Sequence, residues 1–158
     1  METRSYHLAQ LNVGRLRAPL DSPLVAGFVA QLDAINAAAE RAPGFVWRMK
    51  DGDEEAGASL QPAADPRVVV NMSVWLSLEH LREYVYSGDH LRPLRDRAEW
   101  FEKWDGPSFV LWWIPRSSRP RAEQGFARLK YLRLHGPTPR AFAFKDHYPP
   151  PSCEASLR

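Results

Sequence analysis

The order in which strand and helix patterns follow one another constrains the fold of this chain more than any other feature. The patterns run strand, helix, strand, strand, helix, helix, strand and helix. Strands are expected over residues 6–14, 45–49, 67–76 and 108–115, and helices after Asp21-Ser22-Pro23, after Ser77, from Asp89 to Trp104 and over residues 119–135, with a short edge strand over 140–145. This order predicts an α+β fold of the ferredoxin-like split βαβ type with one extra helix.

A sheet of this type carries its helices on one face only. Its other face is hydrophobic and has to be covered, so we expect a homodimer in which two sheets close against each other. We assign residues 1–146 to a single domain and expect the Pro- and Ser-rich tail, residues 147–158, to be disordered.

Composition excludes several classes of protein. With 44% hydrophobic and 25% charged residues the chain has the proportions of a globular domain. No run approaches the ~18 apolar residues of a membrane span, and residues 1–11 lack the apolar stretch of a signal peptide. Cys153 is the single cysteine, which excludes a disulfide framework. We therefore expect a cytoplasmic protein with no membrane partner.

Basic residues gather in one segment near the C-terminal end. Residues 116–140 contain seven Lys or Arg residues and one acid, Glu123. Such a run suits either a phosphate-binding surface or the solvated face of a helix. We favour the helix, because the interleaved apolar residues Phe126, Leu129, Leu132 and Leu134 fit its buried side. The net charge of the chain is only +2, and few aromatic side chains lie within the run. We expect no binding to nucleic acid.

Several segments together resemble a bacterial family, domain of unknown function 3291. The segments that carry the resemblance, in family order, are LAQLNVGRLRAPLDSP, PGFVWRM, VVVNMSVWLSLEHLREYVY, HLRPLRDRAEWFEKW, FVLWWIP and HGPTPRAFAF. The resemblance covers the chain from Leu8 to Phe144. It implies a dimeric α+β barrel, the superfamily of the antibiotic-biosynthesis monooxygenases, whose more distant relatives include haem-degrading enzymes.

The helix expected over residues 89–104 presents the first group of candidate site residues. His90, Arg97 and Phe101 lie on one face of such a helix, with Trp104 beside them. An imidazole and a guanidinium next to aromatic rings suit a haem site, in which His90 binds the iron or acts as acid and base while Arg97 holds an anionic group. The alternative is that His90 only bonds to the backbone of the first helical turn.

Polar residues at the centres of strands form a second group. Asn12 lies on one face of the first expected strand, and Asn71 and Trp75 share one face of the third. Arg48 lies on one face of the second expected strand. One interpretation is a barrel interior that binds a polar ligand. The other is that the two asparagines only bridge neighbouring strands. For the first we expect a substrate pocket between the sheet and helix 89–104, with these residues and Trp100 and Trp112 on its wall.

Motifs of several enzyme classes are absent: the sequence contains no HExxH, paired CxxC, P-loop or GxGxxG after a strand. From the resemblance we predict a monooxygenase-type oxidoreductase that acts on a small molecule, either with haem or with no cofactor. The alternative is a non-catalytic ligand-binding or structural dimer.

Overall fold

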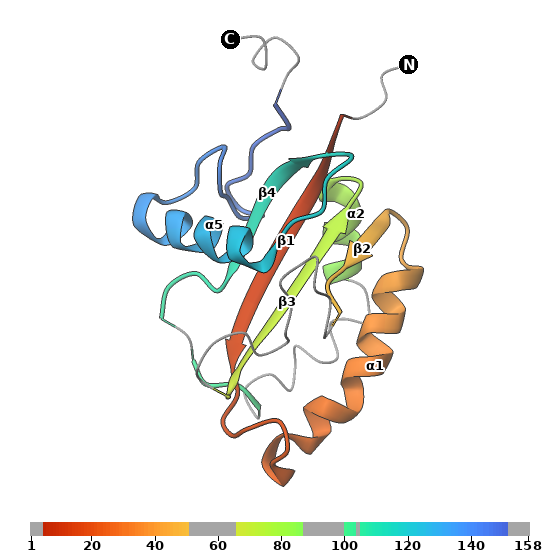
Figure 1. Cartoon of the computed structure of the whole chain (residues 1–158), viewed down its shortest axis with the longest axis vertical. Coiled ribbons are helices and arrows are strands. Elements are labelled where there is room, and N and C mark those ends of the chain that lie inside the picture. Colours follow the sequence, from red (N-terminus) through yellow and green to blue (C-terminus); the bar gives the residue numbers. More distant parts are fainter. Residues whose placement is uncertain (1–4, 51–65, 87–99, 104, 152–158) are drawn as a thin grey trace.

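Four antiparallel strands form one sheet at the centre of the molecule (Figure 1). The structure is a computed structural model, and it describes residues 5–50, 66–86, 100–103 and 105–151. The strands are β1 (Tyr6–Arg15), β2 (Phe45–Arg48), β3 (Val68–Trp75) and β4 (Phe109–Pro115), in the spatial order β2-β3-β1-β4. The first and third strands are thus central, as the split βαβ pattern requires. The predicted α+β, ferredoxin-like fold is confirmed.

Two helical segments begin directly after the capping residues that the sequence predicts, Ser22 and Ser77. Helix α1 (Ala26–Arg41) follows a short 3-10 helix, η1 (Pro23–Val25), whose first turn is capped by Ser22: its hydroxyl accepts a hydrogen bond from the Leu24 backbone N–H. Helix α2 (Leu78–Val85) is capped by the Ser77 hydroxyl in the same way. Helix α5 (Ala122–His135) follows β4.

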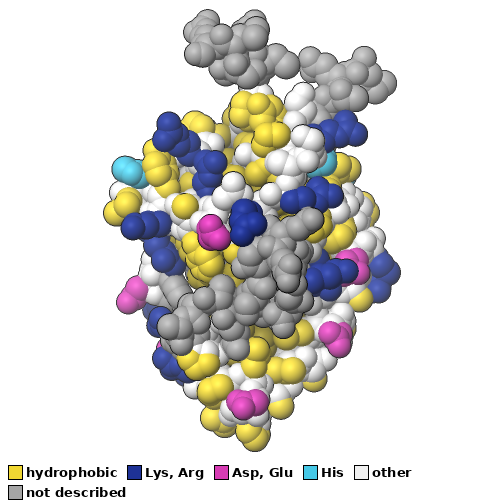
Figure 2. Space-filling view, in the orientation of Figure 1, with side chains coloured by type: hydrophobic (Ala, Val, Ile, Leu, Met, Phe, Trp, Pro, Cys, Tyr) yellow, Lys and Arg dark blue, Asp and Glu magenta, His cyan; other side chains and the backbone are white. Residues whose placement is uncertain are grey.

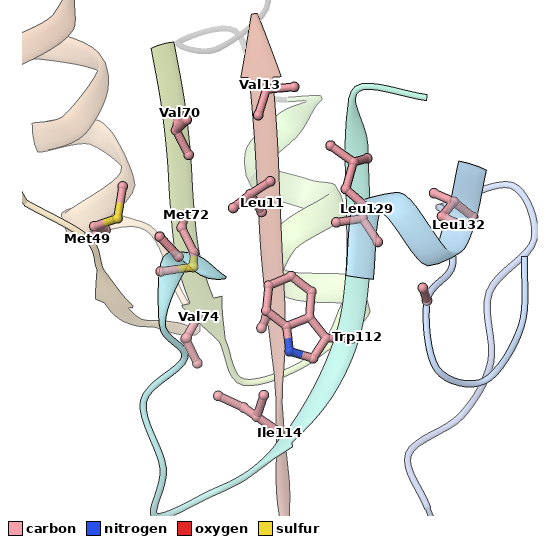
Figure 3. Packing of buried hydrophobic residues seen from close by; sticks show 14 of the residues in the cluster. Leu11, Val13, Met49, Val70, Met72, Val74, Trp112, Ile114, Leu129 and Leu132 are labelled. Carbon is pink, nitrogen blue, oxygen red and sulfur yellow. The ribbon is translucent and has the colours of Figure 1, made fainter. Parts of the chain in front are cut away.

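Helices cover both faces of the sheet. Helices α1 and α2 pack on the face that carries Leu8 and Trp75, through residues such as Ala39 and Leu81. Helix α5 packs on the opposite face, where Leu129 and Leu132 join a cluster of buried side chains from all four strands or their ends (Figure 3). This cluster includes Leu11, Val13, Met49, Val70, Met72, Val74, Trp112 and Ile114. The helix approaches β1 closely at Gly125, where an added Cβ would lie 2.4 Å from the Leu11 Cδ1 atom.

The expectation that helices lie on one face only is therefore wrong. Helix α5 packs on β1 and β4 at this second face, where Ala9, Met72 and Val74 are all 0% exposed within the single chain. An uncovered hydrophobic face was the reason to expect two sheets closing against each other. That reason does not hold for this chain, and the homodimer stays a prediction.

Two predicted helices also differ from the structure in their bounds. Phe101–Lys103 are not helical: Phe101 pairs as an isolated bridge with Leu16, and the Glu102 N–H donates to the Arg15 carbonyl, so the backbone here is extended. The rest of the predicted helix 89–104, apart from Trp100, lies outside the described residues. Helix α5 begins at Ala122, not at residue 119, because Pro120 disfavours helical backbone at the residue before it.

The C-terminal segment forms contacts in place of an edge strand. Over residues 140–145 only isolated bridges occur, one of them between Leu111 and Phe142. Farther on, the Tyr148 carbonyl accepts a hydrogen bond from the Trp113 indole N–H at 2.8 Å, and the Tyr148 ring packs on Phe142. Ordered packing thus reaches two residues into the segment expected as tail. None of the helices described here is long and apolar enough to cross a membrane.

Candidate functional site

A cavity of about 410 Å³ lies between the sheet and helices α1 and α2. Its floor is the face of β1 and β3 that carries Gln10 and Ser73, and its roof includes Leu32, Ile35 and Tyr84. The pocket was expected between the sheet and helix 89–104. Of that segment, the described residues Trp100 and Phe101 line the cavity, and α1 and α2 supply the rest of the described helical wall.

The apolar side of α1 faces this cavity and is not sealed against the sheet. Phe28, Leu32 and Ile35 recur at helical spacing, as a core-facing stripe would, yet they are only half-buried. In α1 only Ala39, which is 8% exposed, is buried. A helix that leaves its apolar side next to empty space provides an apolar wall for a ligand.

A row of polar side chains crosses the floor of the cavity. The Gln10 Nε2 atom donates hydrogen bonds to Asn71 Oδ1 and to Ser73 Oγ, each at 2.7 Å. Ser73 Oγ also accepts from the Trp75 indole N–H at 2.9 Å, and Asn12 Nδ2 reaches Gln10 Oε1 at 3.4 Å. Asn71 thus bridges β1 and β3, whereas Asn12 bonds to Gln10 of its own strand; both asparagines also line the cavity, and their binding of a ligand stays a prediction.

Two side-chain amides at the cavity have hydrogen-bonding capacity left over. Within the described part of the chain, Asn71 Nδ2 makes no hydrogen bond, and neither does the Asn36 side chain, which enters the cavity wall from α1. Asn71 is exposed and Asn36 is half-buried, so water reaches both amides, and a polar group of a ligand would replace that water. The sheet side and the helix side of the cavity therefore each offer a polar group to a ligand.

Arg48 brings a charge to the cavity wall. Its Nε atom donates to Glu40 Oε1 at 2.7 Å, and its Nη1 atom lies 3.4 Å from the Met49 carbonyl oxygen. The Arg48 side chain is 19% exposed, while that of Glu40 is 40% exposed. The hydrogen bond from Arg48 lowers the pKa of the Glu40 carboxyl.

Aromatic rings close the cavity at two ends. At one end the Trp75 ring stacks on Tyr84, with centroids 5.1 Å apart. At the other, Phe28 contacts Trp100 and Phe101, with centroids 5.9 and 5.0 Å away. Phe101 lies directly over Gly14, where an added Cβ would be 2.5 Å from the ring, so only glycine leaves room for it.

The structure brings together most of the predicted pocket residues that it describes. Asn12, Arg48, Asn71, Trp75, Trp100 and Phe101 all line the cavity. Trp112 does not: it pairs with Ala9, so its side chain lies on the opposite face of the sheet, in the cluster beneath α5 (Figure 3). His90, Arg97 and Trp104 lie outside the described residues.

The described residues that line the cavity include no histidine that could serve as an axial ligand of haem. The described residues also contain no group of three or more His, Cys, Asp or Glu side chains that could hold a metal ion. His90 is the one histidine that lies outside the described residues, so an axial histidine for haem in this cavity would have to be His90.

The lining residues that the sequence analysis did not predict as part of a site include Gln10, Ser73, Asn36, Tyr84 and Phe144. Asn36 interrupts the apolar stripe of α1, and a polar residue in such a stripe is a usable signal. Tyr84 was indistinguishable from an ordinary helix residue. Phe144 reaches the cavity from the C-terminal segment and stacks on Phe109 at 5.3 Å, a contact between distant parts of the sequence that leaves no local pattern.

Two of the basic residues of 116–140 donate hydrogen bonds to backbone carbonyls of this chain. Lys and Arg side chains are spread over the face that carries α5, with hydrophobic and acidic side chains between them (Figure 2). Arg128 donates to the Arg140 carbonyl and Arg133 to the Pro107 carbonyl, at 2.9 and 2.8 Å. Part of the hydrogen-bonding capacity of these basic side chains is thus satisfied within the chain.

Comparison with known proteins identifies a family and a fold. The sequence profile described as domain of unknown function (DUF3291) matches residues 7–157. Among solved structures, the protein PA3566 of Pseudomonas aeruginosa is similar with a TM-score of 0.51 and 14% identity, over 74% of this chain and 100% of that one. At this identity the likeness concerns the fold alone.

Two further structures have TM-scores below 0.5. SnoaB of Streptomyces nogalater, a cofactor-independent oxygenase, has a TM-score of 0.46 and 16% identity over 73% of this chain and 98% of its own. Rv0793 of Mycobacterium tuberculosis has a TM-score of 0.48 and 15% identity over 72% and 97%. None of the curated proteins matches this chain.

Proposed function

Because the chain belongs to the family of domain of unknown function 3291, we propose that it is a monooxygenase-like protein that binds a small aromatic molecule in the cavity between its sheet and helices α1 and α2. The observation that carries the proposal is the cavity itself, which has apolar and aromatic walls and one polar row on its floor. Its volume of about 410 Å³ falls within the range of ligand pockets in proteins.

The polar row favours an aromatic ligand that carries an oxygen atom. A hydroxyl or carbonyl oxygen of such a ligand can accept a hydrogen bond from Asn71 Nδ2, which has no hydrogen bond to the described residues. The ligand's ring then lies among Trp75, Tyr84 and Phe28. Amide donors placed in a largely apolar site also stabilise negative charge that develops on the bound oxygen during a reaction.

The reaction we propose is oxidation of this molecule by O2. A substrate with a CH2 group next to its aromatic ring supplies the electrons itself: its two hydrogens leave with one oxygen atom as water, and the other oxygen atom becomes a carbonyl. The polar row would hold the substrate and stabilise its anion before O2 reacts. If haem takes part, His90 is the residue we propose as its ligand and Arg97 as the partner of its anionic groups.

Calorimetric titration with naphthol tests the binding site. Wild-type protein should bind about one molecule per chain. Ile35→Trp places a large ring in the cavity and should weaken binding at least tenfold, whereas Ala34→Trp adds the same ring to the neighbouring, exposed position of α1 and should leave binding unchanged. Failure of the wild-type protein to bind, or equal binding by both variants, would contradict the site.

Oxygen uptake then separates the enzyme from the non-catalytic alternative. An oxygen electrode should record consumption that depends on an aromatic substrate and disappears in Ile35→Trp. Binding without oxygen uptake by any aromatic substrate would favour a ligand-binding protein.

For haem, the expected sign is a sharp Soret band with haemin that is lost in His90→Ala. For the homodimer, a sedimentation mass near 18.0 kDa would refute it.

A further inference from the structure

We propose that Arg48 recognises a carboxylate, so that the molecule bound in the cavity is an aromatic acid. This inference rests on the proposed function, because it assigns a substrate class to the same site. Among the described residues that line the cavity, Arg48 alone carries a charge. The other described polar groups there are amides and hydroxyls, which bind neutral ligands equally well.

The guanidinium of Arg48 is only partly used by the protein. Glu40 occupies the Nε atom at 2.7 Å, and the Met49 carbonyl accepts a long hydrogen bond of 3.4 Å from Nη1. No hydrogen bond within the described part of the chain involves Nη2. A guanidinium has five N–H groups in one plane and can bind two carboxylates along different edges. Glu40 thus fixes one edge of Arg48 and leaves another edge for a ligand.

The position of Arg48 in the sheet extends the polar row toward β2. Arg48 pairs with Ser73, and Ser73 pairs with Gln10, so the three residues form one line across β2, β3 and β1. Paired residues in neighbouring strands project from the same face of a sheet. A carboxylate bound at Arg48 therefore lies next to amide and hydroxyl groups, while the ring attached to it extends over the apolar part of the cavity.

Burial makes this charge effective. The Arg48 side chain is 19% exposed, so water screens it less than it screens the 40%-exposed Glu40. Placing a ligand carboxylate in an apolar cavity without a partner would be costly, and a charge-assisted hydrogen bond to arginine offsets that cost. A neutral ligand of the same shape gains nothing comparable from Arg48.

The test compares two probes of the same shape, naphthoate and its neutral amide, naphthamide, by calorimetric titration at neutral pH. Wild-type protein should bind naphthoate about tenfold or more tightly than naphthamide. Arg48→Gln should remove this preference and still bind naphthamide with nearly wild-type affinity, which also shows that the variant is folded. Arg41→Gln is the matched control, because Arg41 is an exposed arginine at the end of α1 that does not line this cavity. The Arg41→Gln variant should still prefer naphthoate over naphthamide.

The outcomes separate the inference from the proposed function. Equal affinity of the wild-type protein for both probes overturns the role of Arg48 while the binding site stands. A preference that persists in Arg48→Gln, or disappears equally in Arg41→Gln, overturns it as well. If neither probe binds the wild-type protein, the proposed function and the inference fail together.

Discussion

Ser73 is the residue on which the polar floor of the cavity depends, and its replacement gives a measurable prediction. Its hydroxyl oxygen accepts hydrogen bonds from Gln10 Nε2 and from the Trp75 indole N–H. In Ser73→Ala, Gln10 Nε2 keeps its second partner, Asn71 Oδ1. The indole N–H of Trp75, which is 1% exposed, keeps none that the structure shows.

The expected loss follows from this difference. A buried donor left without a partner costs about 1–3 kcal/mol, and the lost bond from Gln10 adds a smaller amount. We therefore expect Ser73→Ala to lower the free energy of unfolding by about 2–3 kcal/mol. Urea denaturation followed by circular dichroism measures it. Ser118→Ala, which removes an exposed hydroxyl bonded to the Pro115 carbonyl, should change stability by no more than about 0.5 kcal/mol.

A double-mutant cycle with Trp75→Phe isolates the indole contribution. The Trp75→Phe variant has no indole N–H that could lose its hydrogen-bond partner. In this background Ser73→Ala should therefore lower the free energy of unfolding by about 1 kcal/mol less than in the wild-type protein. Equal costs of Ser73→Ala in the two backgrounds would refute the reasoning, because the shared hydroxyl would then not couple the two residues.

Two further predictions concern the face of the sheet covered by α5. Gly125→Val should destabilise the protein by roughly 1–3 kcal/mol in urea denaturation, because the valine side chain would collide with Leu11. Combining it with Leu11→Ala should recover part of this loss. No recovery would contradict the close approach of α5 to β1. His7, which is 7% exposed, has its pKa lowered by burial and then by Arg116 and Arg119. The unfolded chain therefore binds more protons just below the ordinary histidine pKa of about 6.5, and stability should fall as the pH drops through that value. His7→Leu should reduce this fall, and an unchanged pH profile would exclude His7 as its source.

Local patterns predicted the four strands, helices α1, α2 and α5, and one face of the central strands, but not the bridges over residues 140–145. Ser22 and Ser77 marked helix starts because a capping hydroxyl acts within a few residues of sequence. Alternation along β1 and β3 placed Asn12 and Asn71 on one face, where the cavity now lies. These features are determined by residues close together in the sequence, and so they can be predicted from it.

Other features depend on which segments meet in space. The apolar stripe of α5 predicts a buried side but not the sheet face on which that side packs, and Leu134 at its end is 70% exposed. Trp112 and Trp113 are adjacent in one strand and must point to opposite faces, and only the register with β1 shows that Trp112 faces away from the cavity. The stripe of α1 likewise cannot distinguish a packed core from the wall of a cavity.

The most direct test of the binding site is an NMR titration of the isotope-labelled protein with naphthoate, followed through side-chain N–H signals. Cavity binding should shift the amide signals of Gln10, Asn36 and Asn71 and the indole signals of Trp75 and Trp100. The Trp112 indole lies on the opposite face of the sheet and should stay in place. Shifts at Trp112 with the cavity signals unmoved would contradict a ligand site between the sheet and helices α1 and α2.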